Sequence, residues 1–244
     1  MARNFNGTSD YIDVSNSPLL TSAPLTVAAW INWGGTTGTN DHWAVGRDDD
    51  VLGRAYTLGI TDSTSQILAQ IQGTPIQSGS TATANVWTHI AFTADASATS
   101  VITVYKNGVP GTPTARNLGA STGITAIGKR TYSGNNDWFN GSIADVGIWA
   151  AALSTTEVIA LAFGARPFMI RPLALRGWWP LDGYIHPAFD FSFLHKSGVL
   201  SGSTYVGAGP PLISSAPILS DIQTPPNNIA KTFPGKILMG QIWM

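Results

Sequence analysis

The chain has 244 residues, and 11% of them are charged, less than half of the roughly 25% found in most soluble domains. The 13 Lys and Arg residues against 14 Asp and Glu residues leave a net charge of −1, which argues against nucleic acid or an anionic membrane as a partner. A hydrophobic fraction of 43% excludes a disordered chain, and the absence of cysteine excludes disulfides, thiolate metal sites and cysteine nucleophiles.

Short β-strands separated by Gly, Asn, Ser and Thr are predicted over most of the chain. In chain order, the expected strands are residues 11–14, 25–33, 43–46, 55–60, 66–71, 87–94, 101–107, 124–129 and 141–149. Asn107-Gly108 predicts a two-residue type I′ hairpin turn, because both residue types tolerate positive φ. Regularly spaced strands with turn signals between them indicate a β-sandwich or a barrel.

One helix is expected between these strands, over residues 154–163. Ser154 and Glu157 have the spacing of a capping box, in which each side chain accepts a hydrogen bond from the backbone of the other. Gly164 supplies a left-handed stop, and Pro167 prevents the helix from continuing. The only glutamate of the chain is therefore predicted to have a structural role.

The last part of the chain differs in composition from the rest. A strand is expected at residues 175–181, followed by a loop-rich stretch to residue 212. Residues 213–244 combine several prolines with many apolar side chains, and proline at this density blocks helices and central strands. We expect an extended arm that covers an apolar surface, either on its own domain or on a neighbour. The arm residues predicted to make assembly contacts are Ile218, Leu219, Ile222, Phe233, Ile237, Leu238 and Trp243.

Several motifs, taken together and in order, resemble those of one known family. They are residues 5–12 (FNGTSDYI), 25–31 (LTVAAWI), 87–93 (WTHIAFT), 104–109 (VYKNGV), 127–129 (IGK), 139–146 (FNGSIADV) and 153–158 (LSTTEV). The series resembles laminin-G-like domains of the concanavalin-A-like lectin/glucanase superfamily. The resemblance implies an all-β fold, a two-sheet antiparallel jelly-roll sandwich with one short helix, to which this chain adds the extended C-terminal arm.

The resemblance also predicts how the domain is organised. The motifs at residues 179–183 (WPLDG), 190–192 (DFS) and 198–202 (GVLSG) are similar to a stretch that opens the domain in many family members, but here they come last. We therefore expect a jelly-roll domain over residues 1–212 that is circularly permuted relative to those members. Its closing strand is expected near residues 176–182, next to the N-terminal strand, and residues 213–244 form the separate arm.

Catalysis is not expected. The glucanases of this superfamily place three carboxylates as E-x-D-x-x-E on one strand, and a chain with one glutamate lacks that set. No zinc motif connects the four histidines, and His89, in the middle of the strand at 87–94, is predicted to be a packed core residue.

No cofactor is expected, and calcium is the one weak metal candidate. Asp48 and Asp50 belong to a run of three Asp residues that is placed on a loop and that also fits a solvated turn. Asp190 is the third candidate, but the family's Asp-x-Ser is usually followed by Gly-Asn, and this chain has Phe193-Leu194-His195 there.

Aromatic and amide side chains near predicted loops give a candidate glycan site. A sugar ring stacks on exposed aromatic faces, and amides bind its hydroxyl groups, although the same residues also serve as lids of a core and in tight turns. The candidate residues are Trp33, Trp43, Asn135, Asn136 and Trp138.

Three functions are compatible with these features. The main prediction is a non-enzymatic phage structural protein, for capsid decoration or for the surface of the head or tail. It would assemble through the arm with other virion proteins and with itself, as a homo-oligomer for which a trimer is one option. The alternative is a lectin-like, carbohydrate-binding adhesion module, and the third is a scaffold domain of a larger extracellular assembly. Since the N-terminus has no apolar core of a secretory signal, we expect synthesis in the host cytoplasm and location in the virion, with an extracellular location as the alternative.

Overall fold

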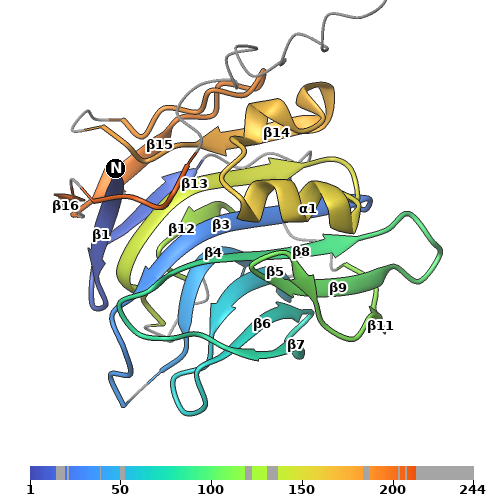
Figure 1. The fold of residues 1–244 in the computed structure, drawn as a ribbon, viewed down its shortest axis with the longest axis horizontal. Helices are drawn as coiled ribbons and strands as arrows, with labels where there is room; N and C mark the ends of the chain where they lie inside the picture. Colours follow the sequence, from blue (N-terminus) through green and yellow to red (C-terminus); the bar gives the residue numbers. More distant parts are fainter. Residues whose placement is uncertain are drawn as a thin grey trace, which may run out of the picture. The chain divides into compact units, whose positions relative to one another are not determined.

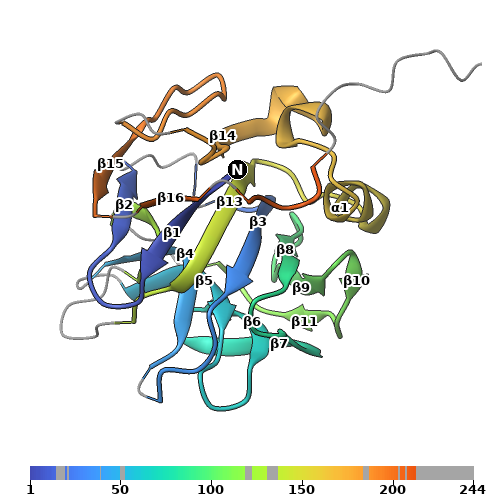
Figure 2. The same ribbon diagram turned by 60° about the vertical axis from the view of Figure 1, so that its left-hand side comes forward.

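Two antiparallel β-sheets pack face to face around a shared core (Figures 1 and 2). The computed structural model describes residues 1–14, 20, 22–38, 40–49, 53–118, 123–130, 137–183, 187–202, 204–206 and 208–212. This arrangement confirms the predicted two-sheet jelly-roll sandwich with one short helix. The predicted arm, residues 213–244, lies outside the described residues, together with all of its expected contact residues.

The larger sheet has nine strands within the described part of the chain. Its main path runs in the order β10-β9-β8-β3-β13-β1-β16, while β11 pairs with β9 and β14 pairs with β13. The bounds are β10 Val109–Pro110, β9 Val101–Lys106, β8 Trp87–Ala94, β3 Leu25–Trp33, β13 Asn140–Trp149, β1 Ala2–Asn6, β16 Thr204–Val206, β11 Thr114–Ala115 and β14 Leu175–Trp179.

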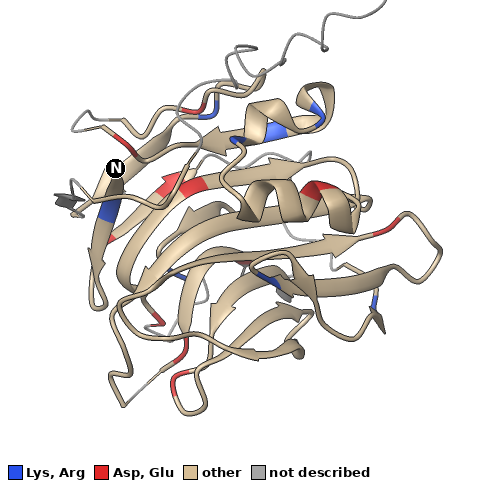
Figure 3. Ribbon diagram, viewed as in Figure 1, with Lys and Arg blue, Asp and Glu red and all other residues tan. Residues whose placement is uncertain are grey.

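The second sheet has seven strands in the described ranges, in the order β15-β2-β12-β4-β5-β6-β7. Their bounds are β15 Gly198–Ser201, β2 Tyr11–Val14, β12 Thr125–Ile127, β4 His42–Asp49, β5 Gly53–Ile60, β6 Gln66–Ile71 and β7 Thr74–Thr81. Charged positions are few on both sheets (Figure 3), in keeping with the low charge fraction of the sequence.

The helix α1 (Thr155–Ala162) covers the outer face of the larger sheet. Its buried residues Val158 and Leu161 belong to a second apolar cluster that includes Trp149 of β13. The capping box is confirmed, because the Ser154 N–H donates to Glu157 Oε2 at 2.8 Å and the Glu157 N–H donates to Ser154 Oγ at 3.3 Å. Neither this helix nor the short 3₁₀ turns η2 (Pro167–Met169) and η3 (Pro172–Ala174) among the described residues is long and apolar enough to cross a membrane.

The last three described strands all join the sandwich, and two of them lie beside its first strands. β14 pairs with β13, with Trp179 opposite Val146, so residues in the range expected to close the domain lie in the larger sheet. β15 pairs with β2 in the second sheet, and β16 pairs with β1 in the larger one. The segment after α1 therefore adds two strands, β14 and β16, to the larger sheet and one, β15, to the second.

The strand predictions failed at polar edges. β7, with the sequence TPIQSGST, was not expected, because only the side chains of Ile76 and Ser78 are well buried and Pro75 is tolerated only because β7 is an edge strand. The run at Asp48 was expected on a loop, but β4 continues through Asp49, and the Asp48 side chain is buried. The Asn107-Gly108 turn is confirmed, with φ of 49° and 81°.

Two tryptophans lie over glycines two residues earlier on the same strand face. A Cβ atom added at Gly177 would lie 2.2 Å from the Trp179 ring, and one at Gly147 would lie 2.4 Å from the Trp149 ring. Both rings are fully buried, so neither can move aside without disturbing the core.

We expect Gly177→Ala to lower the free energy of unfolding by about 2 kcal/mol, since overpacking a dense core forces side chains from their preferred rotamers. Urea unfolding followed by tryptophan fluorescence measures this loss. Val109→Ala, at a strand position that is 64% exposed, is the control and should change stability by less than about 0.5 kcal/mol. Equal effects of the two substitutions would contradict the packing argument.

Candidate functional site

Three phenylalanines point outward from the loop that follows β14. Phe189, Phe191 and Phe193 are 47%, 60% and 70% exposed, whereas the intervening Asp190 and Ser192 are only 4% and 3% exposed. This is the reverse of the usual arrangement, in which the apolar side chains of an alternating segment are buried. Large apolar side chains gathered at a surface mark a binding site more often than single exposed ones do.

The buried Asp190 carboxylate holds this loop in place. One oxygen accepts the N–H groups of Trp178 at 2.9 Å and Ser192 at 2.8 Å, and the other accepts the Lys196 N–H at 2.7 Å and the Ser192 hydroxyl at 2.9 Å. Phe191 adds a backbone hydrogen bond to the Trp178 carbonyl oxygen at 2.9 Å. The exposed rings are therefore attached to a well-bonded backbone.

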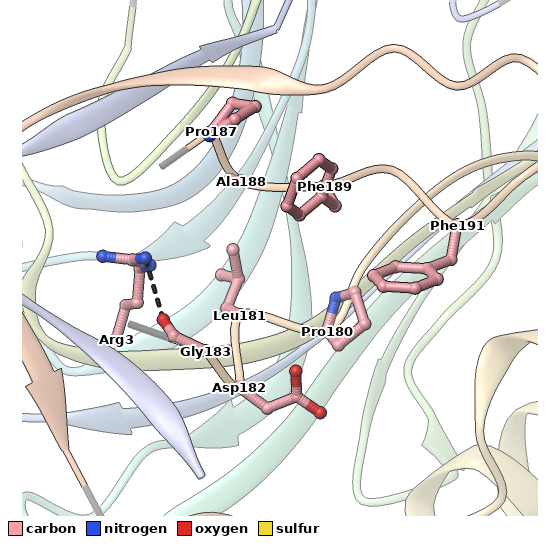
Figure 4. A pocket seen from close by; sticks show the side chains of 9 residues that line it. All are labelled: Arg3, Pro180, Leu181, Asp182, Gly183, Pro187, Ala188, Phe189 and Phe191. Carbon is pink, nitrogen blue, oxygen red and sulfur yellow. Dashed lines mark hydrogen bonds between the residues drawn. The ribbon is translucent and has the colours of Figure 1, made fainter. Parts of the chain in front are cut away.

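A pocket of about 120 Å³ opens beside Phe189 and Phe191 (Figure 4). Arg3, from β1, lies on its opposite side and donates to the Gly183 carbonyl oxygen at 2.9 Å. The pocket thus combines aromatic faces with a guanidinium and a carboxylate that come from segments far apart in the sequence. Its lining residues are Arg3, Pro180, Leu181, Asp182, Gly183, Pro187, Ala188, Phe189 and Phe191.

The rings at the pocket continue into a longer row. Phe191 lies 5.6 Å from Trp178, Trp178 lies 5.2 Å from Phe168, and Phe189 lies 6.5 Å from Phe191, all between ring centroids. We call these four residues the aromatic strip. Phe168 is 46% exposed, while Trp178 is largely buried and connects the two exposed ends.

A charged group lies beneath the strip. Asp145 Oδ1 accepts the Trp178 Nε1–H at 2.7 Å and lies 3.2 Å from Arg166 Nε. Arg166 also reaches Asp182 at 3.4 Å and lies 5.3 Å from the centre of the Trp178 ring. Burial raises the pKa of Asp145 to about 6, although Arg166 and the Trp178 hydrogen bond act in the opposite direction.

Of the residues predicted from the sequence as a glycan site, the three that the structure describes do not line this pocket. Trp33 and Trp43 are 3% and 0% exposed, so their ring faces are part of the core, and burial argues against both as stacking platforms. Trp138 is half-buried and packs on Tyr11 with ring centroids 5.5 Å apart. Asn135 and Asn136 lie outside the described residues.

A buried hydrogen-bond network surrounds Trp43. The Trp43 Nε1–H donates to Asp137 at 3.3 Å, and Asp137 pairs with Arg130 at 2.7 Å. His42 lies between the Asp62 carboxylate, 2.9 Å from Nε2, and the Trp138 carbonyl oxygen, 3.1 Å from Nδ1. This network has a structural role.

The metal candidates do not come together in the described structure. Asp48 is buried in β4, Asp50 lies outside the described residues, and both oxygens of Asp190 already accept hydrogen bonds from the protein. Among the residues that can be described, no group of three or more His, Cys, Asp or Glu side chains is placed to hold a metal ion.

The sequence patterns do not predict the aromatic strip, because residues 182–212, which contain Phe189 and Phe191, are predicted as a loop and Trp178 as part of a strand. The signal was present in the alternation Phe189-Asp190-Phe191-Ser192-Phe193, which pairs aromatic residues with small polar ones at a period of two. That pattern alone does not tell which set faces the core.

The fold defines a β-sandwich of the lectin type, and a family comparison identifies it further. A laminin G family model, described as concanavalin A-like lectin/glucanases superfamily, matches residues 6–159, more than half of the chain. The chain belongs to this superfamily, as the sequence motifs predicted. No curated protein matches the chain.

Solved structures share the fold at low sequence identity. A Bacteroides ovatus protein, provisionally named as carbohydrate binding, has a TM-score of 0.64 and 19% identity over 83% of this chain, which spans 58% of that protein. A heptameric SAP-like pentraxin from Limulus polyphemus has a TM-score of 0.52 and 18% identity, covering 66% of this chain and 81% of the pentraxin. Domain 4 of an extracellular GH43 arabinanase, AbnA from Geobacillus stearothermophilus, solved with arabinotriose, has a TM-score of 0.50 and 20% identity, covering 66% and 76%.

Proposed function

We propose that this protein is a carbohydrate-binding module that takes a sugar in the pocket beside Phe189 and Phe191. The observation that carries the proposal is the pair of exposed rings held at the pocket by the buried Asp190. One face of a sugar ring consists of C–H groups, which stack on an aromatic face, whereas its hydroxyl groups need fixed polar partners. The Asp182 carboxylate, 46% exposed, is such a partner at the same pocket.

The comparisons support the class of ligand and nothing narrower. Two of the proteins with this fold are named for carbohydrate binding or were solved with a sugar, but at 19% and 20% identity they share only the fold with this chain. For this reason the alternative predicted from the sequence, a lectin-like module, is favoured over the virion role.

We propose binding without turnover. Asp145, the carboxylate whose pKa is raised to about 6, would suit a general acid by its pKa alone. It lies beneath Trp178 and does not line the pocket, so it is not placed to protonate a bound glycoside. We also assign a catalytic role to no second carboxylate among the described residues.

We expect Phe191→Ala to weaken glycan binding about tenfold, equivalent to about 1.4 kcal/mol, because it removes the ring with the greatest exposure at the pocket. A glycan array finds the ligand, and titration calorimetry measures both proteins. Phe163→Ala is the matched control, since Phe163 is 76% exposed but belongs neither to the pocket nor to the strip. A blank array, or equal affinity of the wild type and Phe191→Ala, would overturn the proposal.

The assembly role stays a second prediction. It depends on residues 213–244, which lie outside the described residues, and the comparisons name no virion protein. Location in a virion or outside a cell, and self-association, remain proposals as well. A surface jelly roll can serve both as an assembly component and as a lectin, so the two roles are compatible.

A further inference from the structure

The exposed aromatic surface extends beyond the pocket. Phe168 does not line the pocket, yet it packs on the same indole ring as Phe191, at 5.2 Å against 5.6 Å from Trp178. The exposed rings of Phe168 and Phe191 therefore both pack on the largely buried Trp178. The distance between their two centroids is at most the sum of those two distances. A single sugar in the pocket would leave Phe168 unused.

We propose that the aromatic strip binds a glycan chain of several sugars, with one unit in the pocket at Phe189 and Phe191 and a further unit on Phe168. This inference rests on the proposed carbohydrate-binding function and specifies its ligand as an oligosaccharide segment rather than a single terminal sugar.

Polar groups follow the same path as the rings. Asp182 lines the pocket, and its carboxylate lies 3.4 Å from Arg166, whose guanidinium lies 5.3 Å from the centre of the Trp178 ring. Hydrogen-bonding groups of both signs therefore extend from the pocket to the Trp178 ring, on which Phe168 packs. Hydroxyl groups both donate and accept, so successive sugars suit such a row.

The strip is also fixed before any ligand arrives. Phe191 is tied to Trp178 through its backbone, and the Trp178 indole is held by Asp145. Phe168 lies in the 3₁₀ turn η2, where Met169 donates to the Arg166 carbonyl oxygen at 2.9 Å. Groups that are ordered in advance lose less entropy on binding, which favours recognition of an extended chain.

A protein partner is the competing occupant, since exposed aromatic residues are also typical of protein interfaces. Two further exposed apolar residues, Phe163 and Leu173, lie in the same part of the sequence. The row of paired charges along the strip favours a hydroxyl-rich ligand, and the experiment below separates the two.

The test compares affinity with chain length in the full-length protein. The probes are one-, three- and six-unit oligomers of arabinose, xylose, glucose and galactose, measured by titration calorimetry. We expect the six-unit oligomer of the bound sugar to bind at least tenfold more tightly than its monosaccharide. Phe168→Leu, which keeps an apolar side chain but removes the ring, should abolish that gain and leave the monosaccharide affinity within twofold. Phe191→Ala should weaken both, and Phe163→Ala neither.

Each outcome has one meaning. Equal affinity for one and six units, or a Phe168→Leu protein that keeps the gain, overturns the extended site while the pocket proposal survives. No binding of any probe, or of any glycan on the array, overturns both. A Phe168→Leu protein that changes oligomeric state on a sizing column, with unchanged glycan affinity, overturns the inference in favour of a protein partner. Thermal unfolding of each variant establishes that it is folded.

Discussion

Replacing His89 with phenylalanine should raise the stability of the protein relative to the wild type as the pH is lowered from 7.5 to 4. His89 is 2% exposed, its Nδ1 has no hydrogen-bond partner, and its ring lies edge-on to Trp30 with centroids 5.4 Å apart. Burial lowers its pKa from 6.5 to about 3. Phenylalanine keeps a ring next to Trp30 and cannot take up a proton.

The sign of the pH dependence that His89 contributes to stability follows from whether the folded or the unfolded state binds the proton. Below pH 6.5 the unfolded chain protonates this histidine while the folded protein does not, so stability falls as the pH is lowered toward 3. The loss is about 1.4 kcal/mol per pH unit, or about 3 kcal/mol at pH 4. Urea unfolding at pH 7.5 and pH 4 measures it as the change in the stability difference between His89→Phe and the wild type. Val109→Ala, at an exposed position without a titratable group, is the control, and its difference from the wild type should not change with pH. If the difference between His89→Phe and the wild type also stays constant, the argument fails.

Replacing Asp145 with asparagine should have the opposite dependence on pH. Burial raises the pKa of Asp145 from 3.8 to about 6, so the folded protein favours the neutral acid. In the wild type, the stability that this group contributes is present below pH 3.8 and is lost as the pH rises through about 6. Asparagine imitates the neutral acid at every pH.

The stability of Asp145→Asn relative to the wild type should therefore rise by roughly 3 kcal/mol between pH 4 and pH 7.5. The same urea series measures this difference, which removes any constant cost of the substitution, such as a weaker contact with Arg166. Asp95→Asn, at a partly exposed carboxylate on another loop, is the control, and its difference from the wild type should change much less. A constant difference between Asp145→Asn and the wild type would contradict the prediction.

The two groups oppose each other between about pH 4 and pH 6, and both line one small hollow beneath α1. The wild type should therefore change little in stability across that interval. Each single variant should show the pH dependence of stability that comes from the group it retains. The stability of the double variant should be nearly independent of pH.

Local patterns predicted the fold well, because they depend on neighbouring residues. The capping box at Ser154 and the positive-φ turn at Asn107 need only a few adjacent residues, and both are present. The strand β3 was also predicted with its observed bounds, since its continuous apolar run is covered on both faces.

The candidate site was not predictable in the same way. Trp33 ends a strand next to a loop, a position that suggested exposure, but His42 packs on it with ring centroids 5.9 Å apart. The aromatic strip depends on Asp190 reaching Trp178, a contact across 12 residues that determines which side of the loop faces inward. Whether a ring is a platform or part of the core is decided by such distant contacts.

The pairing of β1 with β16 determines how the domain responds to mechanical load. Ala2 lies opposite Val206, and the two strands are antiparallel, so the chain enters and leaves this ladder at the same end. Tension between the N-terminus and the segment after Val206 therefore separates the two strands one residue pair at a time from that end. It does not load all the hydrogen bonds of the ladder at once. β1 is also paired with β13, so separation of β16 leaves β1, which carries the pocket residue Arg3, attached to the larger sheet. We therefore expect tension to separate the last described strand first and to leave the lining of the proposed sugar pocket in place.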